Sequence, residues 1–306
     1  MPDPTELVLT TSFIAALGIF ASASVVRKIQ AKNPVLASAS ELDPEGQESP
    51  YQSPAPSEIP PALPVGKVPT WFYQPLDLIG IGVIYLIFLA LVIGSVRASE
   101  KADLVLDSKS LIASIGFQFF MAGAVLLVMA MRIHPIDWLG LRWRSWPWVF
   151  LIAPSAVFLM WIFFGTLQAA GYMKWMESFG VESVQETVKL LQTSTDPLVL
   201  GLMAFAAVIA APICEELVFR GYFYPTAKKF AGPWAAGIFS ALIFASAHGS
   251  LSALLPLFIF GCLLVLIYEK TGSLWAPIAV HFCFNGATVL VQIAARYYHL
   301  PLDSVQ

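Results

Sequence analysis

Long apolar runs dominate the chain, with short polar stretches between them. A helix that crosses a bilayer needs about 20 mostly apolar residues. The pattern predicts about eight such helices, and therefore an all-α fold class, a polytopic transmembrane helical bundle. The predicted spans are Leu7–Val26, Leu76–Val96, Leu111–Met131, Trp148–Ala170, Pro197 to about Ala227, Pro233–His248, Ala253–Ile267 and Leu274–Ala295.

The composition supports this interpretation. Of 306 residues, 58% are hydrophobic and 12% are charged, whereas about a quarter of a soluble domain is charged. So little charge cannot cover a soluble globule, which excludes an ordinary soluble enzyme. The net charge of -3 lacks the basic footprint of a nucleic-acid-binding protein. The expected partner is therefore the lipid bilayer, and no nucleic acid is expected.

The basic residues between the spans predict the orientation, because lysine and arginine are enriched on the cytoplasmic side. More of them fall in the inside loops when the N-terminus is placed outside. Both termini are then predicted to lie outside. We expect an integral, multi-pass protein of the cell inner membrane.

The chain divides into four predicted regions. Residues 1–28 form a lone transmembrane helix, and the Pro-, Ser- and Glu-rich stretch 29–70 is a cytoplasmic linker, because it cannot bury a core. The alternative use of this stretch is docking of a proline-reading domain. Residues 71–196 hold accessory helices and an interfacial segment, Tyr172 to Gln192. Residues 197–296 hold the catalytic helices.

Four tryptophans precede the fourth span, together with two arginines. Indole rings gather at the level of the lipid headgroups. We therefore predict an interfacial belt formed by Trp138, Trp143, Trp146 and Trp148.

Charged residues within a bilayer are costly, and they indicate functional sites by default. Here they are concentrated late in the chain, as Glu215-Glu216 with Arg220, then His248, then His281 with Asn285. On a helix, residues four apart share a face, so Glu216 pairs with Arg220 and His281 lies beside Asn285. Glu215 is rotated by about 100° from Glu216 and faces a different neighbour.

The turn predicted near Ala231 allows the depths of Glu215 and His248 in the membrane to be compared. Glu215 and His248 lie at nearly equal distances along the chain from this turn, so they reach a similar depth on adjacent helices. This requires the helix with Glu215 to continue to about Ala227. His281 fits this arrangement less well. If all the turns between helices lie at the same depth, His281 is nearer the inside face of the membrane than Glu215 and His248.

These residues suit the hydrolysis of a peptide bond. Glu215 would act as general base on a water, and His281 and Asn285 would donate hydrogen bonds to the oxyanion. Glu216 and Arg220 would hold the helix and tune Glu215. The same types also suit zinc, with Glu215, His248 and His281 as ligands and a water as the fourth, although no HExxH is present. The residue types alone do not separate these two hypotheses.

The three motifs, in this order, resemble the CAAX-protease and bacteriocin-processing family of intramembrane peptidases. That family includes the type II CAAX prenyl endopeptidases. The motifs are Glu215-Glu216-x-x-x-Arg220, Phe244-x-x-x-His248 and His281-x-x-x-Asn285, within about residues 200–290.

The resemblance implies a role for each matching residue. Glu215 activates the water, His248 helps to hold it, and His281 and Asn285 stabilise the oxyanion. The family is often labelled metalloprotease, but a glutamate-dependent mechanism without a cofactor fits its residues better. The implied substrate is a membrane-associated protein or peptide, including prenylated proteins.

Less specific hypotheses remain for the same residues. Glu216 and Arg220 could be an ion pair that fixes helix packing, and Asn285 could join two helices. At the level of the whole protein, the alternatives are a proton-coupled transporter and a catalytically silent scaffold, which would bind a membrane partner or confer bacteriocin immunity. The first four spans offer almost no polar path for a transporter.

Overall fold

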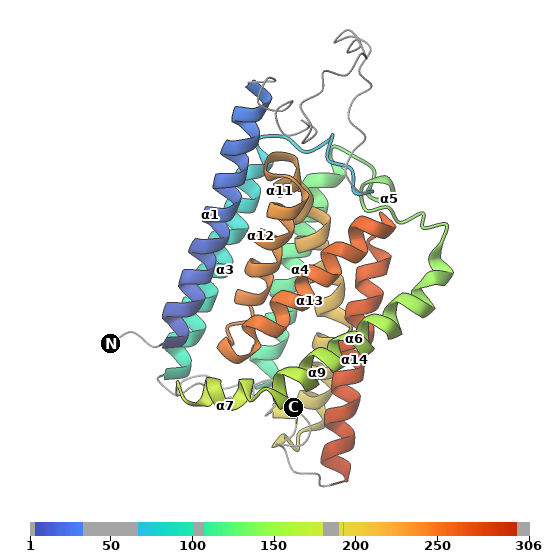
Figure 1. Cartoon of the computed structure of the whole chain (residues 1–306). Helices are drawn as coiled ribbons and strands as arrows, with labels where there is room; N and C mark the ends of the chain where they lie inside the picture. Colours follow the sequence, from blue (N-terminus) through green and yellow to red (C-terminus); the bar gives the residue numbers. More distant parts are fainter. Residues whose placement is uncertain (1–3, 33–66, 101–106, 180–189, 192, 299–306) are drawn as a thin grey trace, which may run out of the picture.

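The computed structural model describes residues 4–32, 67–100, 107–179, 190–191 and 193–298. Within them the elements are helices, with no strand, which confirms the all-α class (Figure 1). Most of the predicted linker and half of the predicted interfacial segment lie outside these residues. The helices outside the long fifth span are α1 (Pro4–Lys32), α3 (Asp77–Glu100), α4 (Ser108–Ala130), α5 (Pro135–Trp138), η2 (Trp146–Trp148), α6 (Val149–Ala169), α7 (Tyr172–Glu177), α12 (Pro233–Ser246), α13 (Leu251–Thr271) and α14 (Trp275–Tyr297).

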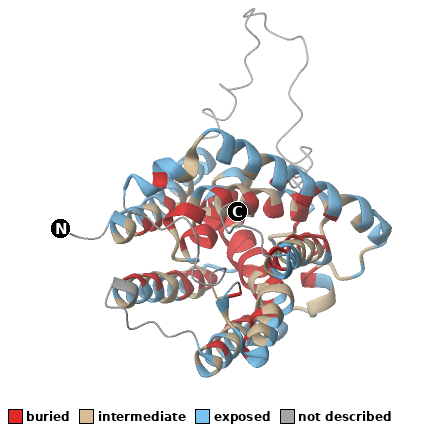
Figure 2. Ribbon diagram, turned by 90° about the horizontal axis from the view of Figure 1, so that it is seen from below, coloured by how far each residue is buried: buried red, intermediate tan, exposed pale blue. Residues whose placement is uncertain are grey.

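Seven of the described helices are long and apolar enough to cross a membrane, and α12 is a shorter apolar helix of 14 residues. Buried residues line the facing sides of the helices, and exposed residues lie on the outside (Figure 2). Many of the exposed side chains are large and apolar, such as Phe120, Phe150 and Leu290. An outer surface of this kind suits contact with lipid. The predicted transmembrane bundle is confirmed.

The fifth span is one continuous helical rod, Pro197–Ala231. It contains two π-helical segments, in the order α9 (Pro197–Phe205), η3 (Ala206–Ala210), α10 (Ala211–Glu216), η4 (Leu217–Phe223) and α11 (Tyr224–Ala231). Gly232 then turns the chain into α12 with a φ of 84°, a value that favours glycine. The helix of Glu215 therefore runs past Ala227, as the prediction about depth required.

Prolines within the helices free backbone carbonyls, because proline has no N–H to donate. The N–H of Ala211 bonds to the oxygen of Ala206 in the π-helical manner. The next residue, Pro212, cannot donate to Ala207. Instead, Asn285 Nδ2 of α14 donates to Ala207 O at 2.8 Å. A polar group buried in a membrane helix needs such a partner.

A related arrangement occurs at Pro225, whose α-helical acceptor, four residues back, would be Gly221. Here Tyr73 Oη and Trp138 Nε1 both donate to Gly221 O, at 2.6 Å and 3.0 Å. Burial raises the pKa of the Tyr73 phenol well above its usual range, so its hydroxyl keeps its proton. In α13, Pro256 likewise frees Ser252 O, which accepts from Tyr172 at 3.1 Å.

Trp138 does not belong to an interfacial belt, so that part of the prediction is wrong. Trp138 is only 1% exposed, and its indole N–H donates a hydrogen bond to the buried carbonyl of Gly221. Trp146 and Trp148 are exposed, as an interfacial position requires. Trp143 is partly buried against the core.

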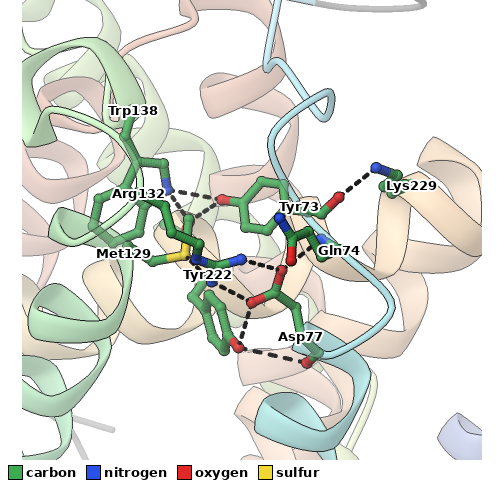
Figure 3. Close-up of polar contacts among 9 residues, drawn as sticks. Tyr73, Gln74, Asp77, Met129, Arg132, Trp138, Tyr222 and Lys229 are labelled. Carbon is green, nitrogen blue, oxygen red and sulfur yellow. Dashed lines mark hydrogen bonds and ion pairs between the residues drawn. The ribbon is translucent and has the colours of Figure 1, made fainter.

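An ion pair between Arg132 and Asp77 lies close to Tyr73 and Trp138 (Figure 3). Arg132, after α4, donates to both carboxylate oxygens of Asp77 at the start of α3, at 2.9 Å and 2.5 Å. Tyr222 of η4 donates to Asp77 Oδ1 at 3.0 Å. Asp77 raises the pKa of the Arg132 guanidinium further. This network joins α3, the end of α4 and η4, where Tyr222 lies two residues beyond Arg220.

The first helix is packed into the bundle, which corrects the prediction of a lone helix. It lies along α11 and α12 (Figure 1). Leu9, Phe13 and Ala16 are fully buried in this contact region. Ser12 Oγ and Ser246 Oγ are 2.6 Å apart, within hydrogen-bond distance. The domain boundaries proposed from the sequence stay predictions.

Candidate active site

Glu215 and His248 lie together on the wall of a cavity. Glu215 Oε2 is 4.0 Å from His248 Nε2, and the two side chains are 21% and 29% exposed. The cavity has a volume of about 100 Å³ and lies where α3, α4, α10, η4 and the end of α12 meet. The prediction that these two residues reach a similar depth on adjacent helices is confirmed.

The hydrogen bond of His248 to its own helix defines its tautomer. Nδ1 lies 2.7 Å from the carbonyl oxygen of Phe244. A carbonyl only accepts, so Nδ1 carries a hydrogen. In the neutral imidazole, Nε2 is then a hydrogen-bond acceptor, and it is the nitrogen that faces Glu215.

Glu216 faces away from this cavity into a fully buried polar cluster. Arg220 Nη1 donates to Glu216 Oε1 at 3.0 Å, with both side chains at 0% exposure, as the four-residue spacing predicted. His281 Nδ1 lies 2.9 Å from the same oxygen. A buried charge of this kind needs both a counter-ion and hydrogen bonds. The cluster therefore ties α14 to the helix of Glu215.

The ring of Phe244 contacts both His248 and the buried cluster of Glu216, Arg220 and His281. The guanidinium carbon of Arg220 lies 4.5 Å from its ring centroid, a cation–π distance. Its ring also lies edge-on to His248 at 4.9 Å and to His281 at 6.0 Å. Phe244 therefore packs between His248 and the Glu216 cluster, and it is not among the residues that line the cavity.

A close approach of α13 completes the surroundings of Arg220. Arg220 Nη2 donates to the carbonyl of Gly261 at 3.1 Å. A Cβ atom at Gly261 would lie 3.0 Å from the Cβ of Ala241, tighter than nearly all real contacts. Glycine therefore allows α12 and α13 to pack closely here.

The structure does not bring all six predicted residues to one surface. His281 and Asn285 are not among the residues that line the cavity. His281 contacts Glu216, and Asn285 bonds to Ala207 O. The bond from Asn285 agrees with the interhelical role that the sequence left open. The oxyanion role of these two residues stays a prediction.

Sequence reasoning missed Gln118 of α4, which lines the same cavity. Its Oε1 atom is buried and has no hydrogen-bond partner among the described residues. The available signal was its isolation, because Gln118 is the single amide or charged residue between Leu111 and Met131.

The predicted zinc ligands do not converge. Glu215 and His248 face one another, whereas His281 Nδ1 is directed to Glu216. Across the described part of the chain, no group of three His, Cys, Asp or Glu side chains is placed to hold a metal ion. The residues therefore do not fit the three-ligand zinc site that the alternative requires.

Comparison with known proteins supports a peptidase. Residues 197–287 match the family described as "Type II CAAX prenyl endopeptidase Rce1-like". A protein of Bacillus subtilis (strain 168), "Putative membrane peptidase YdiL", is 30% identical over 105 residues. That match covers 34% of this chain and 43% of the relative. No solved structure is significantly similar to the chain.

These findings confirm the resemblance that the three motifs predicted. All six predicted site residues lie within the matched segment, residues 197–287. With seven helices able to span a membrane, the chain is an integral, multi-pass membrane protein. Helices α1, α3, α4 and α6 lie outside the match with the family.

Proposed function

We propose that this protein is an intramembrane endopeptidase of the CAAX-protease type. The observation that carries the proposal is the pairing of Glu215 with His248 at 4.0 Å on a cavity wall, inside a segment similar to prenyl endopeptidases. A carboxylate and an imidazole in a cavity within a membrane bundle form a typical hydrolytic pair.

The reaction would begin with a water bound between these two side chains. A separation of 4.0 Å is too long for a direct hydrogen bond but allows one water to bond to both groups. The water would donate one hydrogen to Glu215 Oε2 and the other to His248 Nε2. Glu215 then takes a proton as the water oxygen attacks the carbonyl carbon. The same proton passes to the leaving amine when the C–N bond breaks.

Glu216, Arg220 and His281 would act as positioning residues. Their hydrogen bonds fix α10 and α14 relative to one another and so fix the direction of Glu215. With Nδ1 donating to Glu216, His281 can donate from Nε2 only as imidazolium. The proposed oxyanion role of His281 therefore requires the imidazolium form.

The substrate class comes from the family and from the location of the site. We infer a membrane-associated protein or peptide, with prenylated proteins as the first candidates. The distribution of basic residues favours an orientation with both termini outside, and we propose the cell inner membrane as the location. No metal takes part in the proposed step, because the three suggested ligands do not converge.

The purified protein tests the proposal directly. An internally quenched, farnesylated peptide with two aliphatic residues after the cysteine should be cut by the wild type and not by Glu215→Gln. Binding without cleavage in the wild type would favour the alternative function, a catalytically silent scaffold. That alternative needs the fold but not the Glu215 carboxylate.

A further inference from the structure

The cavity at Glu215 has one polar group that the proposed mechanism does not use. Phe88, Phe117, Met121, Val218 and Phe219 make most of its wall apolar. Apart from the weakly polar thiol of Cys214, the polar side chains on the wall are Glu215, His248 and Gln118. Gln118 comes from α4, across the bundle from the three motifs.

Two buried oxygen atoms on this wall have no hydrogen-bond partner in the described structure, Gln118 Oε1 and Glu215 Oε2. Buried polar atoms are almost always paired, so each exception needs an explanation. For Glu215 Oε2 the explanation is the attacking water of the proposed mechanism. Gln118 Oε1 needs a hydrogen-bond donor that enters the cavity.

The ordinary role of glutamine in a membrane helix does not account for Gln118. Such residues usually hydrogen-bond to a neighbouring helix and hold the bundle together. Asn285 does so through Ala207 O, but Gln118 Oε1 bonds to no helix. Ser114 lies one turn before Gln118 on α4 and carries a hydroxyl, but Gln118 Oε1 accepts no hydrogen bond from it.

We propose that Gln118 binds the substrate by accepting a hydrogen bond from a backbone N–H next to the scissile bond. A side-chain amide carries both an acceptor and donors, as a peptide group does, so it matches an extended backbone. This inference rests on the proposed function, because it requires that a peptide enters the cavity.

The apolar wall adds a limit on the substrate. The cavity of about 100 Å³ is smaller than the roughly 150 Å³ of an engineered cavity that holds one benzene. It therefore accommodates one aliphatic side chain of the substrate. A farnesyl chain is larger than benzene, so a prenyl group would lie outside this cavity.

Binding to an uncleaving protein tests the inference without relying on turnover. The protein is the full chain with Glu215→Gln, and the probe is the farnesylated peptide with two aliphatic residues. A parallel set of peptides carries a methyl group on one backbone nitrogen at a time, which removes one donor. One methylated position should raise Kd by about tenfold, a typical loss for one hydrogen bond.

Adding Gln118→Met should raise Kd for the unmodified peptide by about tenfold and remove the penalty at that position. Phe120→Leu is the matched control, because Phe120 is on the same helix and 69% exposed to the outside. It should leave Kd unchanged. If Gln118→Met does not fold, Gln118→Asn, which shortens the amide, carries the same expectation.

The inference is overturned if Gln118→Met leaves Kd unchanged, if the methylation penalty persists in that variant, or if no methylated position weakens binding. A peptide that does not bind to the Glu215→Gln protein at all overturns it as well. The wild-type protein separates this result from the proposed function. Binding that depends on Gln118 without cleavage would contradict the peptidase function and support the role of Gln118 in peptide binding. Cleavage with an unchanged KM in Gln118→Met would support the peptidase function and contradict the inference.

Discussion

His281 Nδ1 and Glu216 Oε1 lie 2.9 Å apart, and this contact links two motifs that are 65 residues apart in the chain. It divides the acidic pair into two environments. Glu216 is fully buried with Arg220 and His281, whereas Glu215 faces the cavity with His248. Neighbouring glutamates therefore differ in their expected contributions to stability and to chemistry.

Replacing each glutamate by glutamine should separate these contributions. Glu216→Gln leaves the guanidinium of Arg220 buried without its carboxylate, and breaking a buried ion pair costs about 3–5 kcal/mol. Glu215→Gln breaks no ion pair with a lysine or arginine, so its thermal unfolding temperature should stay near that of the wild type. Thermal unfolding in detergent measures both. Equal stability of the two variants would contradict this division.

Asn285 offers a test of its two candidate roles. Asn285→Ala leaves Ala207 O without its donor and should destabilise the protein by about 1–3 kcal/mol. As an oxyanion donor, Asn285 should also be worth about 100-fold in kcat. Pro212→Ala restores a backbone N–H near Ala207, so it should recover stability but not kcat.

The measurement is peptide hydrolysis and thermal unfolding of the single and double variants. Full recovery of kcat in the double variant would assign Asn285 to helix packing alone. Pro212→Ala by itself is the control for any effect of the proline.

The contact of α1 with α12 should matter for stability near the site. Ser246 is fully buried, and Ser12→Ala would leave its hydroxyl without its partner on α1, at a cost of about 1–3 kcal/mol. Ser12→Ala combined with Ser246→Ala should recover part of this loss, because both polar groups are then gone. Thr11→Ala is the matched control, since Thr11 is exposed and bonds only within α1. A loss as large in the control would refute the role of this contact.

Metal removal is expected to leave hydrolysis unchanged. The predicted ligands Glu215, His248 and His281 do not converge, and among the described residues no group of three suitable side chains is placed to hold a metal ion. The rate of peptide cleavage by the purified protein, before and after dialysis against a chelator, measures this. Activity that is lost on dialysis and returns with zinc would show that the mechanism needs a metal.

Much of the site could be predicted because helix geometry converts spacing into position. The pair Glu216 and Arg220 follows from the four-residue spacing, and the meeting of Glu215 with His248 follows from equal distances to the turn at Gly232. These inferences need only a regular rise per residue and one correctly placed turn.

The remaining contacts depend on how distant helices slide and rotate against one another. Trp138 looks interfacial in its local sequence, but its partner is Gly221 O, a carbonyl freed by Pro225 far along the chain. Gln118 carries no motif, so only the packing of α4 against α10 shows that it lines the cavity. His281 contacts Glu216 because of the position of α14 along the bundle axis. The assumption that all turns lie at the same depth does not give this position.

In the proposed mechanism, Glu215 activates a water that cuts a peptide bond. The most direct test compares newly exposed peptide termini in membranes from cells that carry the wild type or Glu215→Gln at equal protein levels. We expect termini that appear only with the wild type, and these would also identify the substrate. Identical termini in both membranes, with candidate substrates present, would contradict the claim and favour a scaffold.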